Sequence, residues 1–271
     1  MDFKDKHIVI TGGGSGIGAE LAKRFSSAGS NVVVADLNSE AANKIASEVN
    51  GLAVECDVSD ETQIQKLVEE ATQQFGPIDL FCSNAGLAID EPDHAASADN
   101  ATWEKNWQVH VMSHVYAARA VLPSMLERGE GYLVNMASAA GLLSQIGNSA
   151  YSATKHAAVG FAESLAISHG DEGIKVSVIC PQYVATPLTG YAEGEEAKTS
   201  LGTINVKTAV DAIMDGITQG RFLILTHPDV EAFIQNKTAD YDRWVGGMRK
   251  MRRGIIEQIG TTDLNQMHKI L

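Results

Sequence analysis

The sequence predicts an α/β fold with a doubly wound parallel β-sheet. Short apolar runs alternate with amphipathic segments from residue 7 to residue 227, the pattern of repeated strand–helix–strand units. Runs such as NVVVAD are apolar at successive positions, as expected for strands that helices cover on both faces. A glycine-rich segment, TGGGSGIG, joins the first such run to the first amphipathic segment. We expect a single domain over residues 1–271.

The expected strands form one seven-stranded parallel sheet and cover 7–11, 31–36, 51–58, 78–86, 131–138, 174–181 and 222–227. Between them, apolar residues recur every three or four positions, which indicates helices over 19–29, 39–49, 61–76, about 101–128 and 149–170. Residues 229–271 form an expected helical extension. Its basic stretch RWVGGMRKMRR is predicted to be a helix that packs through Trp244, Met248 and Met251.

The composition indicates a globular protein that binds neither nucleic acid nor a membrane. The chain has 34 acidic and 21 basic residues, a formal net charge of −13, whereas nucleic acid and anionic membranes favour a basic surface. No apolar stretch has the length of a membrane span, and the mixed charges of MDFKDKH are not those of a signal peptide. Cys56, Cys82 and Cys180 are odd in number and lack metal-ligand spacing. We therefore expect buried, reduced thiols and a cytoplasmic location.

The segment TGGGSGIG lies where a Rossmann-type, dinucleotide-binding fold turns its chain against a pyrophosphate. Its spacing differs from the usual G-x-G-x-x-G. Glycine lets backbone amides approach phosphates, and the N-terminus of the following helix favours their negative charge. We expect Gly12 and Gly16 to lie at the phosphates and Gly18 to let the helix pack closely. The alternative is a glycine-rich turn without a ligand.

Asp36 closes the second expected strand, eighteen residues beyond Gly18. A carboxylate at this place accepts hydrogen bonds from both hydroxyls of an adenosine ribose and repels a 2′-phosphate. Leu37 and Asn38 follow, so no arginine is there to neutralise such a phosphate. The sequence therefore predicts NAD as the cofactor rather than NADP.

Tyr151 and Lys155 are four residues apart on an expected helix and project from one face. An ammonium beside a phenol favours the phenolate, so we expect Lys155 to lower the pKa of Tyr151 toward the range that acid–base catalysis needs. Ser138 lies thirteen residues upstream, where its hydroxyl would hold a substrate oxygen against the tyrosine. Y-x-x-x-K alone is common on surface helices. Together with a nucleotide site and a serine at a strand end, it indicates catalysis.

From His7 to about Arg253 the sequence resembles the classical short-chain dehydrogenases/reductases. The matching motifs are TGxxxGxG, Asp57-Val58, Asn84-Ala85-Gly86, Ser138, Tyr151-x-x-x-Lys155 and Pro181-Gln182-x-Val184-x-Thr186. The resemblance implies that Tyr151 passes a proton to or from the substrate oxygen while hydride moves at the adjacent carbon. It also implies a homotetramer or homodimer that packs the fourth and fifth helices together.

The same resemblance implies a role for each matched residue. The implied cofactor-binding residues are Gly12, Ser15, Gly16, Ile17, Asp36, Asp57, Val58, Asn84, Ala85, Gly86, Tyr151, Lys155, Pro181, Val184 and Thr186. The polar segment over about 187–206 corresponds to a mobile flap over the substrate. The expected substrate contacts are Ser138, Leu142, Tyr151, Gln182, Tyr183 and Leu188, and the apolar ones among them indicate an apolar pocket.

Three positions depart from the family pattern. Ser83 replaces an asparagine after the fourth strand, and Gln182 replaces a glycine beside the expected nicotinamide and substrate sites. His110 takes the place of a catalytic asparagine that, in the family, bends its helix and links the lysine to solvent through a water. A histidine of ordinary pKa, about 6.5, changes charge in the working range. Either His110 serves this relay with an altered pH dependence, or it merely packs.

A zinc site is not expected at His110, although His114 follows it by four residues, because a third ligand is missing.

Three functions remain open. The first is an NAD-dependent oxidoreductase that interconverts a small or medium-sized, apolar secondary alcohol and a ketone. The second is a 3-oxoacyl-(acyl carrier protein) reductase, although Asp36 opposes its usual NADPH and the net charge of −13 opposes its acidic carrier. The third is a non-enzymatic NAD-binding regulator, which would not need Tyr151 and Lys155.

Overall fold

In the computed structural model, which describes residues 2–91, 93–197 and 202–267, seven parallel strands form one sheet in the order β3-β2-β1-β4-β5-β6-β7. The strands are β1 (His7–Thr11), β2 (Asn31–Asp36), β3 (Leu52–Glu55), β4 (Leu80–Ser83), β5 (Gly131–Met136), β6 (Ile174–Ile179) and β7 (Leu223–Ile224). The predicted seven-stranded parallel sheet is confirmed. The strand order reverses between β1 and β4, and open α/β sheets bind their ligands at such a reversal.

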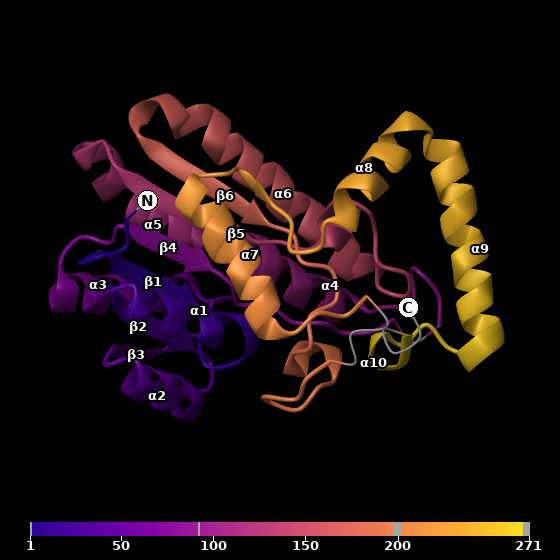
Figure 1. Cartoon of the computed structure of the whole chain (residues 1–271), viewed down its shortest axis with the longest axis horizontal. Coiled ribbons are helices and arrows are strands. Elements are labelled where there is room, and N and C mark those ends of the chain that lie inside the picture. Colours follow the sequence, from indigo (N-terminus) through magenta and orange to yellow (C-terminus); the bar gives the residue numbers. More distant parts are fainter. Residues whose placement is uncertain (1, 92, 198–201, 268–271) are drawn as a thin grey trace.

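Helices cover both faces of this sheet (Figure 1). They are α1 (Gly16–Ser27), α2 (Ser39–Glu48), α3 (Glu61–Phe75), α4 (Asn100–Trp107), α5 (Ser113–Arg128), α6 (Ser149–His169) and α7 (Val206–Gln219). Successive side chains of a strand point to opposite faces. Ile8 and Ile10 of β1 therefore pack with α1, α2 and α7, whereas Val9 packs with α3, α5 and α6. The apolar runs of the sequence thus supply two cores, one on each face.

Five of the strands end two or three residues earlier than the sequence predicts. The residues beyond these ends include Asp57, Asn84 and Ser138, which leave the sheet and line a cleft. Apolar character continues past the last paired residue, so the sequence pattern alone does not mark the point where pairing stops.

The helix predicted over about 101–128 is interrupted. Helices α4 and α5 are joined by a π-helical turn, Gln108–Met112, which has His110 at its centre. The Ser113 hydroxyl donates a hydrogen bond to the Val109 carbonyl at 2.7 Å in this turn. Such turns occur frequently at functional sites. Helix α7, in contrast, is absent from the predicted elements.

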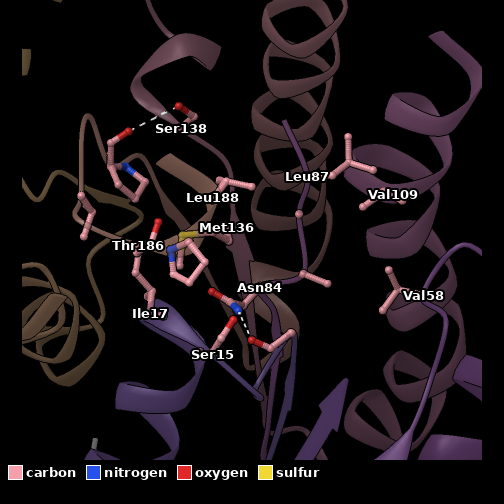
Figure 2. A pocket seen from close by; sticks show the side chains of 18 of the residues that line it. Ser15, Ile17, Val58, Asn84, Leu87, Val109, Met136, Ser138, Thr186 and Leu188 are labelled. Atoms are coloured by element: carbon pink, nitrogen blue, oxygen red, sulfur yellow. Dashed lines mark hydrogen bonds between the residues drawn. The ribbon is translucent and has the colours of Figure 1, made fainter. Parts of the chain in front are cut away.

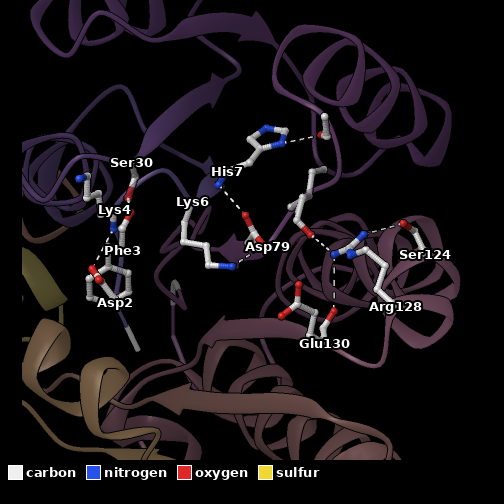
Figure 3. A network of polar contacts seen from close by, with 12 residues as sticks. Asp2, Phe3, Lys4, Lys6, His7, Ser30, Asp79, Ser124, Arg128 and Glu130 are labelled. Atoms are coloured by element: carbon white, nitrogen blue, oxygen red, sulfur yellow. Dashed lines mark hydrogen bonds and ion pairs between the residues drawn. The ribbon is translucent and has the colours of Figure 1, made fainter.

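At the amino end of the sheet, Asp79 ties the start of β1 to the start of β4 (Figure 3). Its carboxylate accepts hydrogen bonds from the His7 N–H at 2.8 Å and from the Lys6 ammonium at 3.1 Å. Arg128, at the end of α5, donates to the carbonyl of Ile78 at 2.8 Å. These contacts fix the amino ends of the central strands. The carboxyl ends of the same strands border the cleft described below.

The C-terminal residues form α8 (Asp229–Ala239), α9 (Tyr241–Ile259) and α10 (Leu264–Met267). We call residues 229–259 the C-terminal arm. Figure 1 shows α9 standing apart from the sheet, with α8 at one end and α10 near the other. Among the residues of α9, all of which the structure describes, Ile255 alone is buried, and it packs with Met267. Residues 268–271 of the predicted extension lie outside the described residues.

The predicted helix over the basic stretch is confirmed, but its expected packing is wrong. Trp244 and Met248 are half-buried and Met251 is exposed, and all three face a cavity rather than a core. Across the described ranges, no helix combines the length and the apolarity that crossing a membrane requires.

Two helical glycines generate a stability prediction. A Cβ on Gly216 of α7 would stand 2.6 Å from the Ile224 side chain of β7, whereas a Cβ on Gly160 of α6 would meet no atom within 4 Å. Alanine gains about 1 kcal/mol of helix propensity at either site, and overpacking costs about 1–3 kcal/mol at the first. In urea unfolding, we expect Gly160→Ala to raise the free energy of unfolding and Gly216→Ala to lower it. Equal shifts in both variants would contradict the close packing of α7 on β7.

Candidate active site

A cleft of about 400 Å³ lies at the carboxyl ends of the central strands (Figure 2). Figure 2 shows Ser15, Ile17 and Asn84 at one end of it and Ser138 at the other. All fifteen residues predicted to bind the cofactor line this cleft, namely Gly12, Ser15, Gly16, Ile17, Asp36, Asp57, Val58, Asn84, Ala85, Gly86, Tyr151, Lys155, Pro181, Val184 and Thr186. Residues from the ends of five strands and from two helices thus meet in one place.

The turn between β1 and α1 presents bare backbone to the cleft. Gly12 has a φ of 62°, and a Cβ on it would stand 2.8 Å from the Cα of Ala85. A Cβ on Gly18 would stand 2.1 Å from the Gly12 carbonyl oxygen, so α1 packs closely, as predicted. Ser15 precedes α1 without capping it through its side chain. A helix N-terminus with exposed amides and a hydroxyl fits the pyrophosphate of a dinucleotide.

Asn84 joins the end of β4 to this turn. Its side-chain amide donates to the carbonyls of Thr11 at 2.9 Å and Gly12 at 3.0 Å, and its N–H donates to the Thr11 hydroxyl at 3.1 Å. These bonds satisfy carbonyls that the close packing would otherwise leave unpaired. Asn84 therefore shapes the turn.

Asp36, the last residue of β2, also lines the cleft. Its carboxylate accepts hydrogen bonds from the N–H groups of Gly14 and Asn38, each at 2.9 Å. Each oxygen keeps a further lone pair for a ribose hydroxyl. The two backbone bonds hold the carboxylate in place, so it presents a fixed negative charge at this end of the cleft.

Asp57 lies beside Lys105 of α4, a lining residue that the sequence reasoning missed. Burial raises the pKa of Asp57, but hydrogen bonds from the hydroxyl and N–H of Ser59, together with the charge of Lys105, outweigh it and lower the pKa. Asp57 is therefore ionised at neutral pH. Among the described residues that line the cleft, the basic ones are Lys105 and Lys155.

Ser138, Tyr151 and Lys155 meet at the other end of the cleft. The Ser138 hydroxyl accepts a hydrogen bond from the Ala140 N–H at 3.1 Å. Tyr151 lies in the first turn of α6, and the Lys155 ammonium is 5.6 Å from its ring centroid. That ammonium donates to the Met136 carbonyl at 3.0 Å. The spacing of Tyr151 and Lys155 on one helical face is as predicted.

Burial dominates the titration of this group. It raises the pKa of Tyr151, and a side-chain hydrogen bond with Ser138 opposes the rise. It lowers the pKa of Lys155 to about 8. The prediction that Lys155 brings the pKa of Tyr151 below its ordinary value is therefore wrong for this structure, because desolvation of the phenol is the largest effect and raises its pKa.

His110 lies behind the cleft and does not line it. Its Nε2 accepts a hydrogen bond from the Leu87 N–H at 3.2 Å, so Nδ1 carries the proton and donates to the Thr154 hydroxyl at 3.0 Å. Its ring packs edge-on against Tyr151, with the centroids 5.2 Å apart. Both ring nitrogens are thus committed to the protein.

The pKa of His110 lies well below its ordinary value because the ring is buried and Lys155 is nearby. Of the two alternatives for His110, this low pKa favours the one in which the ring stays neutral and packs against its neighbours. His114, one turn later, is also buried, and burial lowers its pKa to about 3. In the part of the chain that the structure describes, no group of three or more histidine, cysteine or acidic side chains is placed to hold a metal.

A second cavity, of about 620 Å³, adjoins the first and shares Ser138 and Gln182 with it. Of the other predicted substrate contacts, Tyr183 lines the second cavity, whereas Tyr151 and Leu188 line the first. Leu142 lines neither, and its side chain packs against the core that α5 and α6 share. That expectation is wrong, since the chain turns after Ser138 and brings the next residue, Leu143, into the cavity instead.

His227 holds the segment that carries Gln182. Its Nδ1 accepts a hydrogen bond from the Gln182 N–H at 3.3 Å, and its Nε2 donates to the Tyr183 carbonyl at 3.1 Å. Nothing in the local sequence marked His227, which lies 45 residues away. The predicted flap begins with a short helical turn, Pro187–Thr189, and its residues 198–201 lie outside the described residues.

Comparisons with known proteins agree with this geometry. Residues 6–197 match the family model described as short chain dehydrogenase. The chain is 30% identical to 1-deoxy-11-beta-hydroxypentalenate dehydrogenase of Streptomyces exfoliatus, over 90% of this chain and 91% of that protein. It is 37% identical to 3beta-hydroxysteroid dehydrogenase 2 of Eggerthella lenta, over 66% of this chain and 71% of that protein.

The crystal structure of a short chain dehydrogenase/reductase from Burkholderia phymatum in complex with NAD has the same fold. It superimposes with a TM-score of 0.81 at 28% identity, covering 89% of this chain and 96% of that one. The matched residues include the glycine-rich turn, Ser138, Tyr151 and Lys155. The chain therefore belongs to the classical short-chain dehydrogenase/reductase family of oxidoreductases.

Proposed function

We propose that this protein is an NAD-dependent oxidoreductase that interconverts a secondary alcohol and a ketone. The observation that carries the proposal is the position of Ser138 and Gln182, which border both the dinucleotide cleft and the second cavity. A substrate that enters the second cavity therefore reaches Ser138 at the border with the cleft. Tyr151 and Lys155 lie at the same junction, on the cleft side.

Oxidation of a secondary alcohol removes a hydride from the carbinol carbon and a proton from its hydroxyl. NAD, when bound in the cleft, supplies the hydride acceptor. Tyr151 accepts the proton as general base, Ser138 holds the oxygen by a hydrogen bond, and in ketone reduction Tyr151 returns the proton. Burial raises the pKa of Tyr151. In the proposed mechanism, the positive charge of Lys155, 5.6 Å from the ring centroid, stabilises the phenolate when the proton leaves. With a pKa of about 8, Lys155 is mostly protonated at neutral pH.

Asp36 supports NAD over NADP. Its carboxylate is fixed by two backbone hydrogen bonds and keeps lone pairs toward the cleft. A 2′-phosphate would meet this charge, and the neighbouring Leu37 offers no compensating cation. The similar protein from Burkholderia phymatum was solved with NAD.

Two other functions are weaker. A 3-oxoacyl-(acyl carrier protein) reductase would need NADPH and an acidic carrier, which Asp36 and the net charge of −13 oppose. A non-enzymatic NAD-binding regulator has no use for Ser138, Tyr151 and Lys155 gathered at one end of the cleft. Turnover with NAD separates the alcohol oxidoreductase from the carrier-protein reductase, and any turnover excludes the regulator.

We further propose a homo-oligomer, a tetramer or a dimer, that packs the α4–α5 and α6 surfaces together. Trp107 of α4 is 44% exposed and Ile167 of α6 is 84% exposed, so both helices present apolar side chains to solvent. Covering such side chains is favourable.

The role of Tyr151 gives the first prediction of this proposal. Tyr151→Phe removes the proton donor and keeps the ring, so the turnover number should fall by about 10²–10⁴. NADH binding, followed by nicotinamide fluorescence, should stay within a few-fold of wild type. Retained turnover in this variant would remove Tyr151 from the chemistry.

The cofactor preference gives the second prediction. Asp36→Ala removes the fixed charge, and the ratio of kcat/KM for NAD to that for NADP should fall at least about tenfold, equivalent to about 1.4 kcal/mol. Glu55 of β3 is the matched control, because it pairs with Asp36 in register but does not line the cleft. Glu55→Gln should leave the ratio unchanged. A wild type that prefers NADP would overturn the proposal for Asp36.

His110 gives the third prediction. Its pKa in the folded state lies well below the unfolded value of about 6.5, so below pH 6.5 the unfolded chain binds more protons and stability is lost as the pH falls. One such histidine contributes about 1.4 kcal/mol per pH unit in that range. His110→Asn should therefore make the fall in unfolding free energy between pH 6.5 and pH 5 less steep. It should leave the acid limb of the kcat/KM profile in place, and a displaced limb would show that His110 titrates during turnover.

A further inference from the structure

We propose that the cavity beneath the C-terminal arm binds the bulky, apolar and uncharged part of the substrate, and that Lys237 holds the arm in place as its wall. This proposal rests on the proposed function, because it takes the reacting carbon to lie at Ser138. In place of the small or medium-sized alcohol expected from the sequence, it assigns a large one.

The size and lining of the cavity set the class of ligand. Its volume of about 620 Å³ lies within the range of sites that enclose a drug-sized molecule. Much of the wall is apolar, with Leu143 and Ile146 on one side and Phe233, Trp244, Met248 and Met251 of the arm on the other. Methionine side chains adapt to irregular apolar surfaces.

The charges of the lining indicate that the ligand is uncharged. Among the described residues of the wall, the charged side chains are those of Asp240 and Arg243. They carry opposite charges and lie three positions apart at the start of α9. They leave no net charge to attract an anion or a cation. Ser138 lies at one end of the wall, so the hydroxyl or keto group points there and the apolar remainder extends under the arm.

The arm needs an anchor, because α9 buries only Ile255 among its residues. Lys237 of α8 supplies that anchor and is itself only 6% exposed. Its ammonium donates to the carbonyls of Leu142 at 2.7 Å and Leu143 at 3.0 Å, and lies 3.5 Å from Nε2 of His156. The three contacts join the arm to the segment after Ser138 and to α6.

Aromatic rings complete the environment of this ammonium. The Lys237 Nζ lies 5.0 Å from the ring centroid of Trp244 and 5.4 Å from that of Tyr241, both in α9. Cation–π attraction to these rings is stronger for a desolvated cation than for an exposed one. A single buried charge therefore fixes α8, α9 and the Ser138 segment relative to one another, which makes Lys237 a positioning residue for the cavity wall.

The first test fills the cavity and uses two neighbouring glycines of α9. Gly247 lines the cavity and Gly246 does not, while a Cβ on either would meet no atom within 4 Å. The probes are cyclohexanol and a 3β-hydroxysteroid, and the measured quantity is the ratio of kcat/KM for the steroid to that for cyclohexanol. Gly247→Leu should lower this ratio at least tenfold, and Gly246→Leu should leave it at the wild-type value. Equal ratios in the two variants would overturn the assignment of the cavity.

The second test removes the anchor. Lys237→Met keeps the length of the side chain and loses the charge, so the KM for the steroid should rise at least tenfold, with a smaller change in kcat. Hydrogen exchange of the backbone amides in α8 and α9 should become faster in the same variant. Lys237→Arg keeps the charge and should recover part of the loss. Wild-type exchange and wild-type KM in Lys237→Met would refute the anchoring role.

A binding measurement separates this inference from the proposed function. Trp244 lines the cavity, so steroid binding should change the tryptophan fluorescence without any turnover. Steroid binding that Gly247→Leu weakens would support the cavity even in an enzyme that oxidises no alcohol. Turnover of cyclohexanol with NAD, without steroid binding, would overturn the inference and leave the proposed function standing.

Discussion

The close packing of the β1–α1 turn against the end of β4 is the constraint on which the site depends. A Cβ on Gly18 would lie 2.1 Å from the Gly12 carbonyl oxygen, and a Cβ on Gly12 would lie 2.8 Å from the Cα of Ala85. The side-chain amide of Asn84 donates hydrogen bonds to the carbonyls of Thr11 and Gly12, which lie at this contact. Because β1 and β4 flank the reversal of strand order, the contact sets the floor of the cleft. The pairing of β4 with β5 then carries Ser138 to its far end.

Burial decides how the catalytic end of the cleft titrates. Desolvation is the largest effect on three groups, the phenol of Tyr151, the ammonium of Lys155 and the imidazole of His110. In each case it stabilises the neutral form relative to the charged one. The pKa of the phenol rises and those of the two bases fall. Of the three groups, Lys155 alone keeps its charge near neutral pH, so in the proposed function it supplies the field in which Tyr151 exchanges its proton. His110 supports this group through hydrogen bonds to Leu87 and Thr154 rather than through a charge.

In the function proposed above, the two cavities divide the binding of cofactor and substrate between different parts of the chain. Strand ends and the first turns of helices build the cleft, and these are rigid because the sheet and its two cores hold them. The second cavity has a wall from the arm, whose buried residues are Val230, Lys237 and Ile255. Substitutions in such a wall can change which substrates the cavity accepts, while the chemistry at Ser138 stays the same.

The sequence by itself determined the seven parallel strands, the glycine-rich turn, the acid at the end of β2 and the pairing of Tyr151 with Lys155. Each of these follows from periodicity or from residues that are adjacent along the chain. The resemblance to a known family supplied the fifteen residues expected at the cofactor, and all fifteen line the cleft.

Only the tertiary structure decided the pKa values, the interruption of the helix at His110 and the cavity beneath the arm. The pKa values depend on desolvation, which distant segments impose together. Lys237 reads in the sequence as a surface cation, yet its ammonium is buried on carbonyls 94 and 95 residues away. Likewise Leu143 rather than Leu142 faces the cavity, because the turn after Ser138 sets the direction of each side chain. Local patterns carry information over a few residues, whereas burial and cavity shape arise from contacts between segments far apart in the chain.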